Sequence, residues 1–301
     1  MTLRSGPISV PAPAKINLYL HVTGRRPDGY HLLDSLIAFA GVHDRPRLAP
    51  ADDLSLVIEG PYGEGLATDS ENLVMQAAVW LREAAGIKTG AHMVLEKNLP
   101  VASGIGGGSA DCAAVLCGLS RMWGIEADAV DLIQLGLKLG ADVPVCLFGR
   151  AAFMSGIGED IAAAPILPPA WLVLVNPGAG LSTPAVFEAR RAALGDKWSE
   201  LGQFEEPPVN AADLAGLLRT RNNDLTDGAI SLHPVIRDVL QALDKTDGVL
   251  LARMSGSGAT CFGLFNDSRG AERAAAVLGG KHPQWWIIAS PLLAETTPLA
   301  G

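Results

Sequence analysis

The chain has 301 residues, of which 49% are hydrophobic and 18% are charged. This balance predicts a folded protein of about two domains and excludes a chain that is disordered throughout. The net charge of −9 argues against nucleic acid as a partner, because proteins that bind it usually carry basic surfaces.

The sequence gives no signal for export or membrane insertion. The first residues contain prolines where a signal peptide needs an apolar core, and the most apolar stretch, 161–178, is interrupted by four prolines. The four cysteines form neither a CxxC pair nor a metal-ligand pattern with histidine; they are Cys112, Cys117, Cys146 and Cys261. We therefore expect buried free thiols, a cytoplasmic location and no membrane partner, with a redox or metal role for the cysteines as the alternative.

The first predicted element is a strand within 14–22, where apolar residues alternate with polar ones at a period of two. The alternation predicts a half-buried strand and places Lys15 and Asn17 on the same face. A similar alternation at 54–60 predicts a second strand.

A helix is predicted over 70–86, because apolar residues recur at helical spacing between a candidate N-cap, Ser70, and a stop signal, Gly86. The pattern then predicts, in order, a strand at 91–100, helices at 109–122 and 129–140, and two short strands around Gly149 and Arg150.

A proline-rich stretch at 162–170 separates these elements from the second half of the chain. Beyond it the pattern predicts a strand at 171–178, helices near 183–194, 210–220 and 234–244, two strands around a glycine turn within 249–266, a helix at 271–279 and a strand at 285–290. Strands and helices alternate without the steady rhythm of a doubly wound sheet. We therefore expect a two-layer α+β fold with two domains, 1–165 and 166–301.

A glycine-rich loop carries the strongest indication of chemistry. Residues 104–108 contain four glycines, directly after a predicted strand and before a predicted helix. A bare backbone lets N–H groups approach an anion closely, and the helix start adds unpaired donors and partial positive charge. The loop matches neither the G-x-x-x-x-G-K-[ST] nor the G-x-G-x-x-G pattern, so a dinucleotide-dependent oxidoreductase is disfavoured. We interpret it as a phosphate cradle of another design, with a flexible connector as the alternative.

Four residues outside the loop are further candidates. Lys15 lies on an apolar strand and is either a functional cation or a surface lysine with a buried stem. Tyr30 and His31 follow a turn, "RRPDG", and either present an aromatic face and an imidazole to a ligand or pack ordinarily. Asp142 would be a general base near a cation and a substrate hydroxyl, whereas alone it would be a turn or cap residue.

Together these segments resemble the GHMP superfamily of small-molecule kinases, which includes galactokinase, homoserine kinase and mevalonate kinase. Residues 100–109 match its loop pattern, P-x-x-x-G-x-G-G-G-S, and "MSGSGATCFGLF" at 254–265 is similar to its C-terminal glycine motif. "PAKINLYLHVTGRRPDGYH" and "GADVPVCL" are similar to the family of 4-diphosphocytidyl-2-C-methyl-D-erythritol kinases. The resemblance runs from about Pro11 to the last predicted strand.

The resemblance implies ATP-dependent phosphorylation of the 2-hydroxyl of that cytidine diphosphate substrate, a step of the non-mevalonate isoprenoid pathway. It implies a cleft between an N-terminal domain like domain 2 of a ribosomal protein and a ferredoxin-like C-terminal domain. ATP and the substrate are the expected partners, Mg²⁺ is expected with no ligands assigned, and the chain is expected to be a monomer or homodimer. Another kinase of the superfamily and a non-catalytic nucleotide sensor are the alternatives.

The resemblance also implies roles for individual residues. The catalytic pair would be Lys15 and Asp142, with Asp142 as the base that Lys15 keeps ionised. The ATP-binding residues would be Lys97, near the adenosine, and Pro100, Val101, Ala102, Ser103, Gly104, Ile105, Gly106, Gly107, Gly108, Ser109 and Ala110. The substrate-binding residues would be Asn17, Tyr30, His31, Phe187, Gly256, Ser257 and Gly258.

Within this set, Tyr30 and Phe187 are expected to stack on the cytosine, while His31 reads its edge. The Ser109 hydroxyl is expected to meet a phosphate or Mg²⁺. In "RNNDLTDGA", at 221–229, Thr226 stands where the family usually has Glu, so no role is assigned to that segment.

Overall fold

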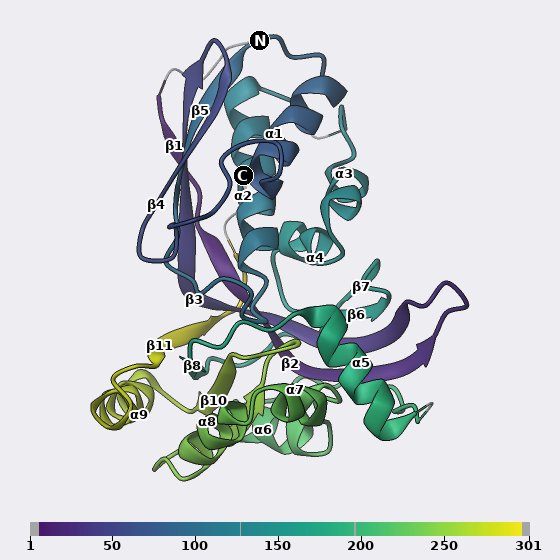
Figure 1. Cartoon of the computed structure of the whole chain (residues 1–301), viewed down its shortest axis with the longest axis vertical. Coiled ribbons are helices and arrows are strands. Elements are labelled where there is room, and N and C mark those ends of the chain that lie inside the picture. Colours follow the sequence, from purple (N-terminus) through teal and green to yellow (C-terminus); the bar gives the residue numbers. More distant parts are fainter. Residues whose placement is uncertain (1–5, 127, 196, 297–301) are drawn as a thin grey trace.

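The computed structural model describes residues 6–126, 128–195 and 197–296 (Figure 1). The strands are β1 (Ile8–Ser9), β2 (Ala12–Arg25), β3 (His31–Ala51), β4 (Leu54–Glu59), β5 (Gly90–Glu96), β6 (Ala152–Gly156), β7 (Asp160–Ala163), β8 (Trp171–Asn176), β9 (Leu251–Met254), β10 (Cys261–Phe265) and β11 (Trp286–Leu293). The helices are α1 (Leu73–Ala84), α2 (Gly107–Trp123), α3 (Leu132–Leu139), α4 (Val143–Phe148), α5 (Thr183–Leu194), α6 (Ala211–Arg219), α7 (Thr226–Leu232), α8 (Val235–Asp244) and α9 (Ser268–Lys281).

Figure 1 shows two halves joined by long strands. Helices α1 to α4 lie beside the strands of the upper half, α6 to α9 surround β8 to β11 in the lower half, and β2 and β3 run between the halves. The strand order is β4-β5-β3-β11-β8-β10-β9, with β1, β2 and β6 also paired to β3 and β7 paired to β6. Because β11 pairs with β3 at one end and with β8 along its length, it continues the sheet from one half into the other.

Small residues allow α2 to lie in the middle of the upper half. Its sequence, "GGSADCAAVLCGLSRMW", is rich in alanine and glycine, and residues 110–119, which form its middle, are all buried. A side chain at Gly118 would overlap Leu48 of β3, since a Cβ there would lie 2.4 Å from a leucine methyl carbon. The close packing fixes the position of the N-terminus of α2, which faces the region between the halves (Figure 1).

The expected α+β fold class is confirmed, and most predicted elements are present with shifted ends. The N-cap of α1 is Asn72 rather than Ser70; its side chain accepts a hydrogen bond from the backbone N–H of Val74. Helix α2 begins two residues earlier than predicted, because Gly106 adopts the left-handed conformation and acts as its N-cap. Ranges 183–194, 210–220 and 234–244 are confirmed as helices.

Several elements were predicted wrongly or not at all. The apolar run before Gly149 is the helix α4 and not a strand: Pro144 fits the first helical turn, and buried short runs do not distinguish the two structures. Strand β3, 21 residues long, was not predicted, because its centre is buried on both faces and prolines interrupt its second half. Helix α7 was also not predicted.

Strand β2 is buried on both faces, so the prediction of a half-buried strand was wrong. Helix α2 packs against it, and the backbone of Leu20 is hydrogen-bonded to residues 222 and 224 of the lower half. Lys15 is only 4% exposed, which rules out the alternative of a surface lysine with a buried stem. The predicted strand at 54–60, by contrast, is half-buried as expected.

The four cysteines are buried and free, as expected. Burial raises the pKa of each of their thiols above its usual range, so none is a reactive thiolate at neutral pH. Across the part of the chain that is described, no helix combines the length and the apolar character needed to cross a membrane.

Candidate active site

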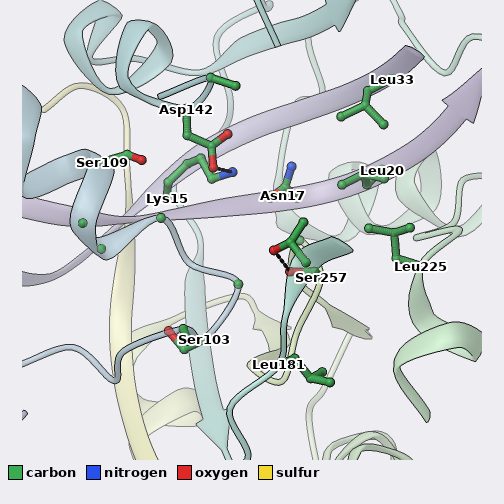
Figure 2. Close-up of a pocket in the computed structure, with 18 of the residues that line it drawn as sticks. Lys15, Asn17, Leu20, Leu33, Ser103, Ser109, Asp142, Leu181, Leu225 and Ser257 are labelled. Atoms are coloured by element: carbon green, nitrogen blue, oxygen red, sulfur yellow. Dashed lines mark hydrogen bonds and ion pairs between the residues drawn. The ribbon is translucent and has the colours of Figure 1, made fainter. Parts of the chain in front are cut away.

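A cavity of about 500 Å³ opens between the two halves. Figure 2 shows that its walls come from β2, from the loop before α2 and from the lower half of the molecule. Two glycine-rich segments meet in it: the glycine loop, residues 100–109, and the C-terminal loop, residues 255–259. The cavity therefore collects segments from both ends of the chain.

Lys15 and Asp142 form an ion pair at this cavity. The Lys15 Nζ donates to Asp142 Oδ2 over 2.9 Å, although the residues are 127 positions apart in the sequence (Figure 2). Asp142 precedes α4 at its N-cap position, but its side chain makes no capping hydrogen bond and turns to the lysine instead. The carboxylate is about one third exposed, so one side of it is open to the cavity.

The glycine loop needs glycine where it passes close to other backbone. Gly104 has φ of 77°, and a Cβ there would lie 2.5 Å from the backbone oxygen of Ser255. Gly106 has φ of 62° and starts α2, so the free N–H groups of this helix point toward the cavity that Gly107, Gly108 and Ser109 line. Free N–H groups and the helix dipole favour an anion at this place.

The C-terminal loop holds the glycine loop from the other side. The Ser255 hydroxyl accepts the backbone N–H of Asn17 over 3.0 Å and donates to the backbone oxygen of Gly104 over 3.0 Å. The backbone N–H of Thr260 donates to the backbone oxygen of Ser103. These bonds fix β2 and the two loops to each other.

Asn223 supports the C-terminal loop and was not singled out from the sequence. Its side-chain Nδ2 donates to the backbone oxygens of Met254 and Gly256, each over 2.8 Å. Its Oδ1 accepts the backbone N–H of Leu225, whose side chain lines the cavity. The similarity of "NNDLT" to the family motif was a signal for this residue, but the departure at Thr226 removed it from consideration.

A second cavity, of about 470 Å³, adjoins the first along shared wall residues: Leu33, Ile157, Thr183 and Phe187. It contains Tyr30, His31 and Phe187 together, as the sequence predicted. The rings of His31 and Phe187 are stacked, with centroids 4.6 Å apart and planes at 19°, while Tyr30 is 61% exposed. One face of the Phe187 ring is thus covered by His31.

Three other predicted site residues lie behind the cavity wall. Ile105 and Ala110 turn their side chains into the core, and Gly258 packs against Gly104 and Met254. Asn17 lines the cavity, where its Nδ2 donates to Ser35 and its buried Oδ1 has no partner among the described residues.

Comparisons with known proteins now decide the family. The "GHMP kinases N terminal domain" matches residues 72–150, and "GHMP kinases C terminal" matches residues 205–283. The chain is 52% identical to 4-diphosphocytidyl-2-C-methyl-D-erythritol kinase of Paramagnetospirillum magneticum, over 95% of this chain and 98% of that protein. It is 49% identical to the enzyme of the same name from Rhodospirillum rubrum, over 95% of this chain and 92% of that protein. The chain belongs to the 4-diphosphocytidyl-2-C-methyl-D-erythritol kinase family.

Solved structures agree with this family. The crystal structure of 4-(cytidine 5'-diphospho)-2C-methyl-D-erythritol kinase matches with a TM-score of 0.75 and 37% identity, over 95% of this chain and 99% of that one. A homoserine kinase from Cytophaga hutchinsonii matches with a TM-score of 0.72 and 18% identity, over 99% and 98%, which supports the fold alone. The GHMP kinase fold expected from the sequence is confirmed, and the oxidoreductase alternative is excluded. The domain boundary at 165 stays a prediction, and it falls between the two matched regions.

Lys97 of this GHMP kinase does not line the cavity. Its Nζ donates to Asp111 Oδ2 over 2.6 Å and also to Asp44 Oδ2, and all three side chains are buried. Burial lowers the pKa of Lys97, but the two carboxylates raise it more, so the lysine stays charged. For Asp111, burial raises the pKa, and the ammonium opposes this effect only in part.

The Mg²⁺ expected with ATP was tested against the donors present. No group of three His, Cys, Asp or Glu side chains in the described ranges is arranged to hold a metal ion. The oxygen donors at the cavity include the Ser109 hydroxyl at the start of α2 and the Asp142 carboxylate. They fit an ion that takes most of its ligands from phosphates and water, as Mg²⁺ commonly does in kinases.

Proposed function

We propose that this chain transfers the γ-phosphoryl group of ATP to the 2-hydroxyl of 4-diphosphocytidyl-2-C-methyl-D-erythritol. Relatives that are 49–52% identical to it carry the name of that activity. The observation that carries the proposal is the pair of Lys15 and Asp142, 2.9 Å apart, in the cavity that both glycine-rich loops line. A nucleotide sensor without activity would not need such a pair.

In this proposal Asp142 is the general base. It accepts the proton of the 2-hydroxyl while the hydroxyl oxygen bonds to the γ-phosphorus, the bond from that phosphorus to its bridging oxygen breaks, and ADP leaves. Lys15 holds and orients Asp142 through their ion pair. Phosphoryl transfer asks mainly for positioning and charge stabilisation, which this pair of a buried ammonium and a partly exposed carboxylate provides.

The triphosphate would lie on the glycine loop. Backbone N–H groups at the start of α2 and the Ser109 hydroxyl are placed to bind the β- and γ-phosphates. A Mg²⁺ ion bound there would neutralise charge on the phosphates, and the Ser109 hydroxyl and the Asp142 carboxylate would be the side chains to hold it.

The second cavity would take the cytosine. Tyr30 and Phe187 line it from two different segments, and His31 covers one face of the Phe187 ring, so a cytosine must use the other face or displace His31. Burial and the nearby Arg25 lower the pKa of His31, so its ring is neutral at neutral pH and offers both a donor and an acceptor to the base. The Oδ1 of Asn17, which has no partner among the described residues, is a further acceptor in the wall of the first cavity.

An ADP-release assay with a panel of acceptors tests the proposal. We expect turnover with 4-diphosphocytidyl-2-C-methyl-D-erythritol and none with methylerythritol phosphate or homoserine, because these lack the cytidine group. The Asp142→Asn variant is the control for contaminating ATPase activity. Equal turnover of homoserine would favour another kinase of the superfamily, and a nucleotide-dependent rise in melting temperature without ADP release would favour a sensor.

A cytoplasmic location remains part of the proposal. It is supported by four buried free thiols, which suit a reducing compartment. Cell fractionation with an antibody against the chain tests the location, and sedimentation shows which of the two expected states, monomer or homodimer, the chain adopts.

A further inference from the structure

A buried ion triad lies behind the glycine loop, formed by Lys97, Asp44 and Asp111. The ammonium is hydrogen-bonded to one oxygen of each carboxylate. The three residues come from different parts of the fold: Lys97 directly follows β5, Asp44 lies in β3 and Asp111 lies in the first turns of α2. Burying three charges is costly in free energy, so such a group is weak support for stability by itself. Its position suggests another reason for it.

The triad fixes both ends of the glycine loop. Asp44 Oδ1 accepts the backbone N–H groups of Asn98 and Leu99, over 2.6 and 2.8 Å, just before the loop begins. Asp111 lies on α2 just after the loop ends. Lys97 joins these two carboxylates, so the residues on either side of the loop are held to β3 through one ammonium.

The triad also lies directly beneath the start of α2. A Cβ on Gly107 would be 3.5 Å from Asp44 Oδ2 and 3.5 Å from Lys97 Nζ. The other side of Gly107 lines the cavity, whereas none of the three charged residues does. The charges are therefore separated from a ligand on the loop by the backbone of about one residue.

We propose that Lys97 is a positioning residue, which sets the glycine loop for phosphate through Asp44 and Asp111 and does not bind the adenosine. This deepens the proposed function, and it rests on that function for the identity of the nucleotide. The role differs from the adenosine contact that the family resemblance implies, because the ammonium is already used by two carboxylates inside the core.

The charges of the triad predict how variants behave. Lys97→Met removes the cation and leaves the carboxyl groups of Asp44 and Asp111 together in the core. Even when one of them takes up a proton, negative charge without a partner remains beneath the phosphates, and both ends of the loop lose their shared anchor. Adding Asp111→Asn removes one of these carboxyl groups, so the double variant should recover part of the lost affinity. A lysine that touched the adenosine itself would give no such recovery.

Binding measurements by calorimetry test this without any turnover. The probes are a non-hydrolysable ATP analogue, inorganic tripolyphosphate and adenosine, each added to the wild type, Lys97→Met, Asp111→Asn and the double variant. Lys88→Met is the matched control, since Lys88 is exposed just before the other end of β5. Thermal melting of each variant shows that it is folded.

We expect Lys97→Met to lower the affinity for the ATP analogue and for tripolyphosphate by the same factor, about tenfold, and to leave the affinity for adenosine unchanged. The double variant should bind both phosphate probes more tightly than Lys97→Met, and Lys88→Met should match the wild type. The proposal would be overturned if Lys97→Met lowered the affinity for adenosine but not for tripolyphosphate, or if the double variant recovered no affinity for the phosphate probes.

If Lys97→Met does not fold, Asp111→Asn and the double variant carry the same comparison. Between Asp111→Asn and the double variant, the affinity for the ATP analogue and the affinity for tripolyphosphate should fall by the same factor. A lower affinity for adenosine would again overturn the proposal. Absence of kinase turnover in the wild type would instead contradict the proposed function and leave these binding results standing.

Discussion

The two adjoining cavities form one site with two ends, and these ends differ in how firmly their residues are held. The phosphate end is the glycine loop, and the cytidine end is the second cavity. The glycine loop is bonded to the C-terminal loop through Ser255 and is anchored at both ends by the ion triad. At the second cavity, Tyr30 is largely exposed, and the Phe187 ring is stacked on one face only, by His31. Under the proposed function, this contrast predicts a preorganised phosphate end and a cytidine end that adapts when its ligand binds.

The largest expected effect lies where the two ends meet, at Asp142. Asp142→Asn keeps the size of the side chain but removes the base, so we expect kcat to fall about 10²–10⁴-fold with KM for both substrates little changed. Steady-state kinetics measures this, and thermal melting shows whether Lys15 tolerates a neutral partner. Turnover at the wild-type rate would exclude Asp142 as the base.

The preorganised end is tested by Gly104→Ala. The Cβ would meet the backbone oxygen of Ser255 at 2.5 Å in a left-handed conformation, which costs at least about 1 kcal/mol in strain alone. We expect a lower melting temperature and a KM for ATP raised more than the KM for the cytidine substrate. Gly180→Ala is the matched control, since a Cβ at Gly180 meets nothing within 4 Å. Equal effects of the two variants would contradict a loop held in place by the C-terminal loop.

The adaptable end is tested by Tyr30→Ala and Phe187→Ala. Stacking of a base on an aromatic ring is worth about 1–3 kcal/mol, so each variant should raise KM for the cytidine substrate about 5- to 150-fold. KM for ATP should rise much less, because neither side chain belongs to the glycine loop, although Phe187 also lines the first cavity. Tyr30→Phe keeps the ring and serves as the control. A parallel rise in both KM values would show that the two cavities are not separate binding regions.

The site was easier to predict from the sequence than the elements that build it. The glycine loop has a local signature, and the family motifs linked Lys15 to Asp142, which the structure places 2.9 Å apart. Helix α4 was mistaken for a strand, because its short apolar run is buried all round and shows no periodicity. Asp44 was missed as well, since a carboxylate within a long strand, 53 positions before its lysine, has no local signal.

Two side-chain contacts between residues far apart in the sequence were not predicted, either from the sequence pattern or from the family resemblance. Lys97 lies next to the glycine loop in sequence, which favoured a nucleotide contact, yet its ammonium turns into the core toward α2. The stacking of His31 on Phe187 joins residues from β3 and α5, and nothing in either segment alone predicts it.

The smallest expected effect is a pH dependence at the adaptable end. Burial, together with Arg25, Arg190 and Arg191, lowers the pKa of His31, so protonation of its ring needs more acid than for an ordinary histidine. We therefore expect KM for the cytidine substrate to stay constant from pH 9 down to about pH 6.5, the ordinary value for histidine, and to rise a few-fold only below it. Measuring KM and kcat separately at saturating ATP distinguishes this effect on binding from changes in the chemical step. In His31→Gln, which cannot be protonated, the rise in acid should disappear. A wild-type KM that rises already between pH 8 and pH 7 would mean that the free ring is protonated in that range, so that its pKa is raised and not lowered.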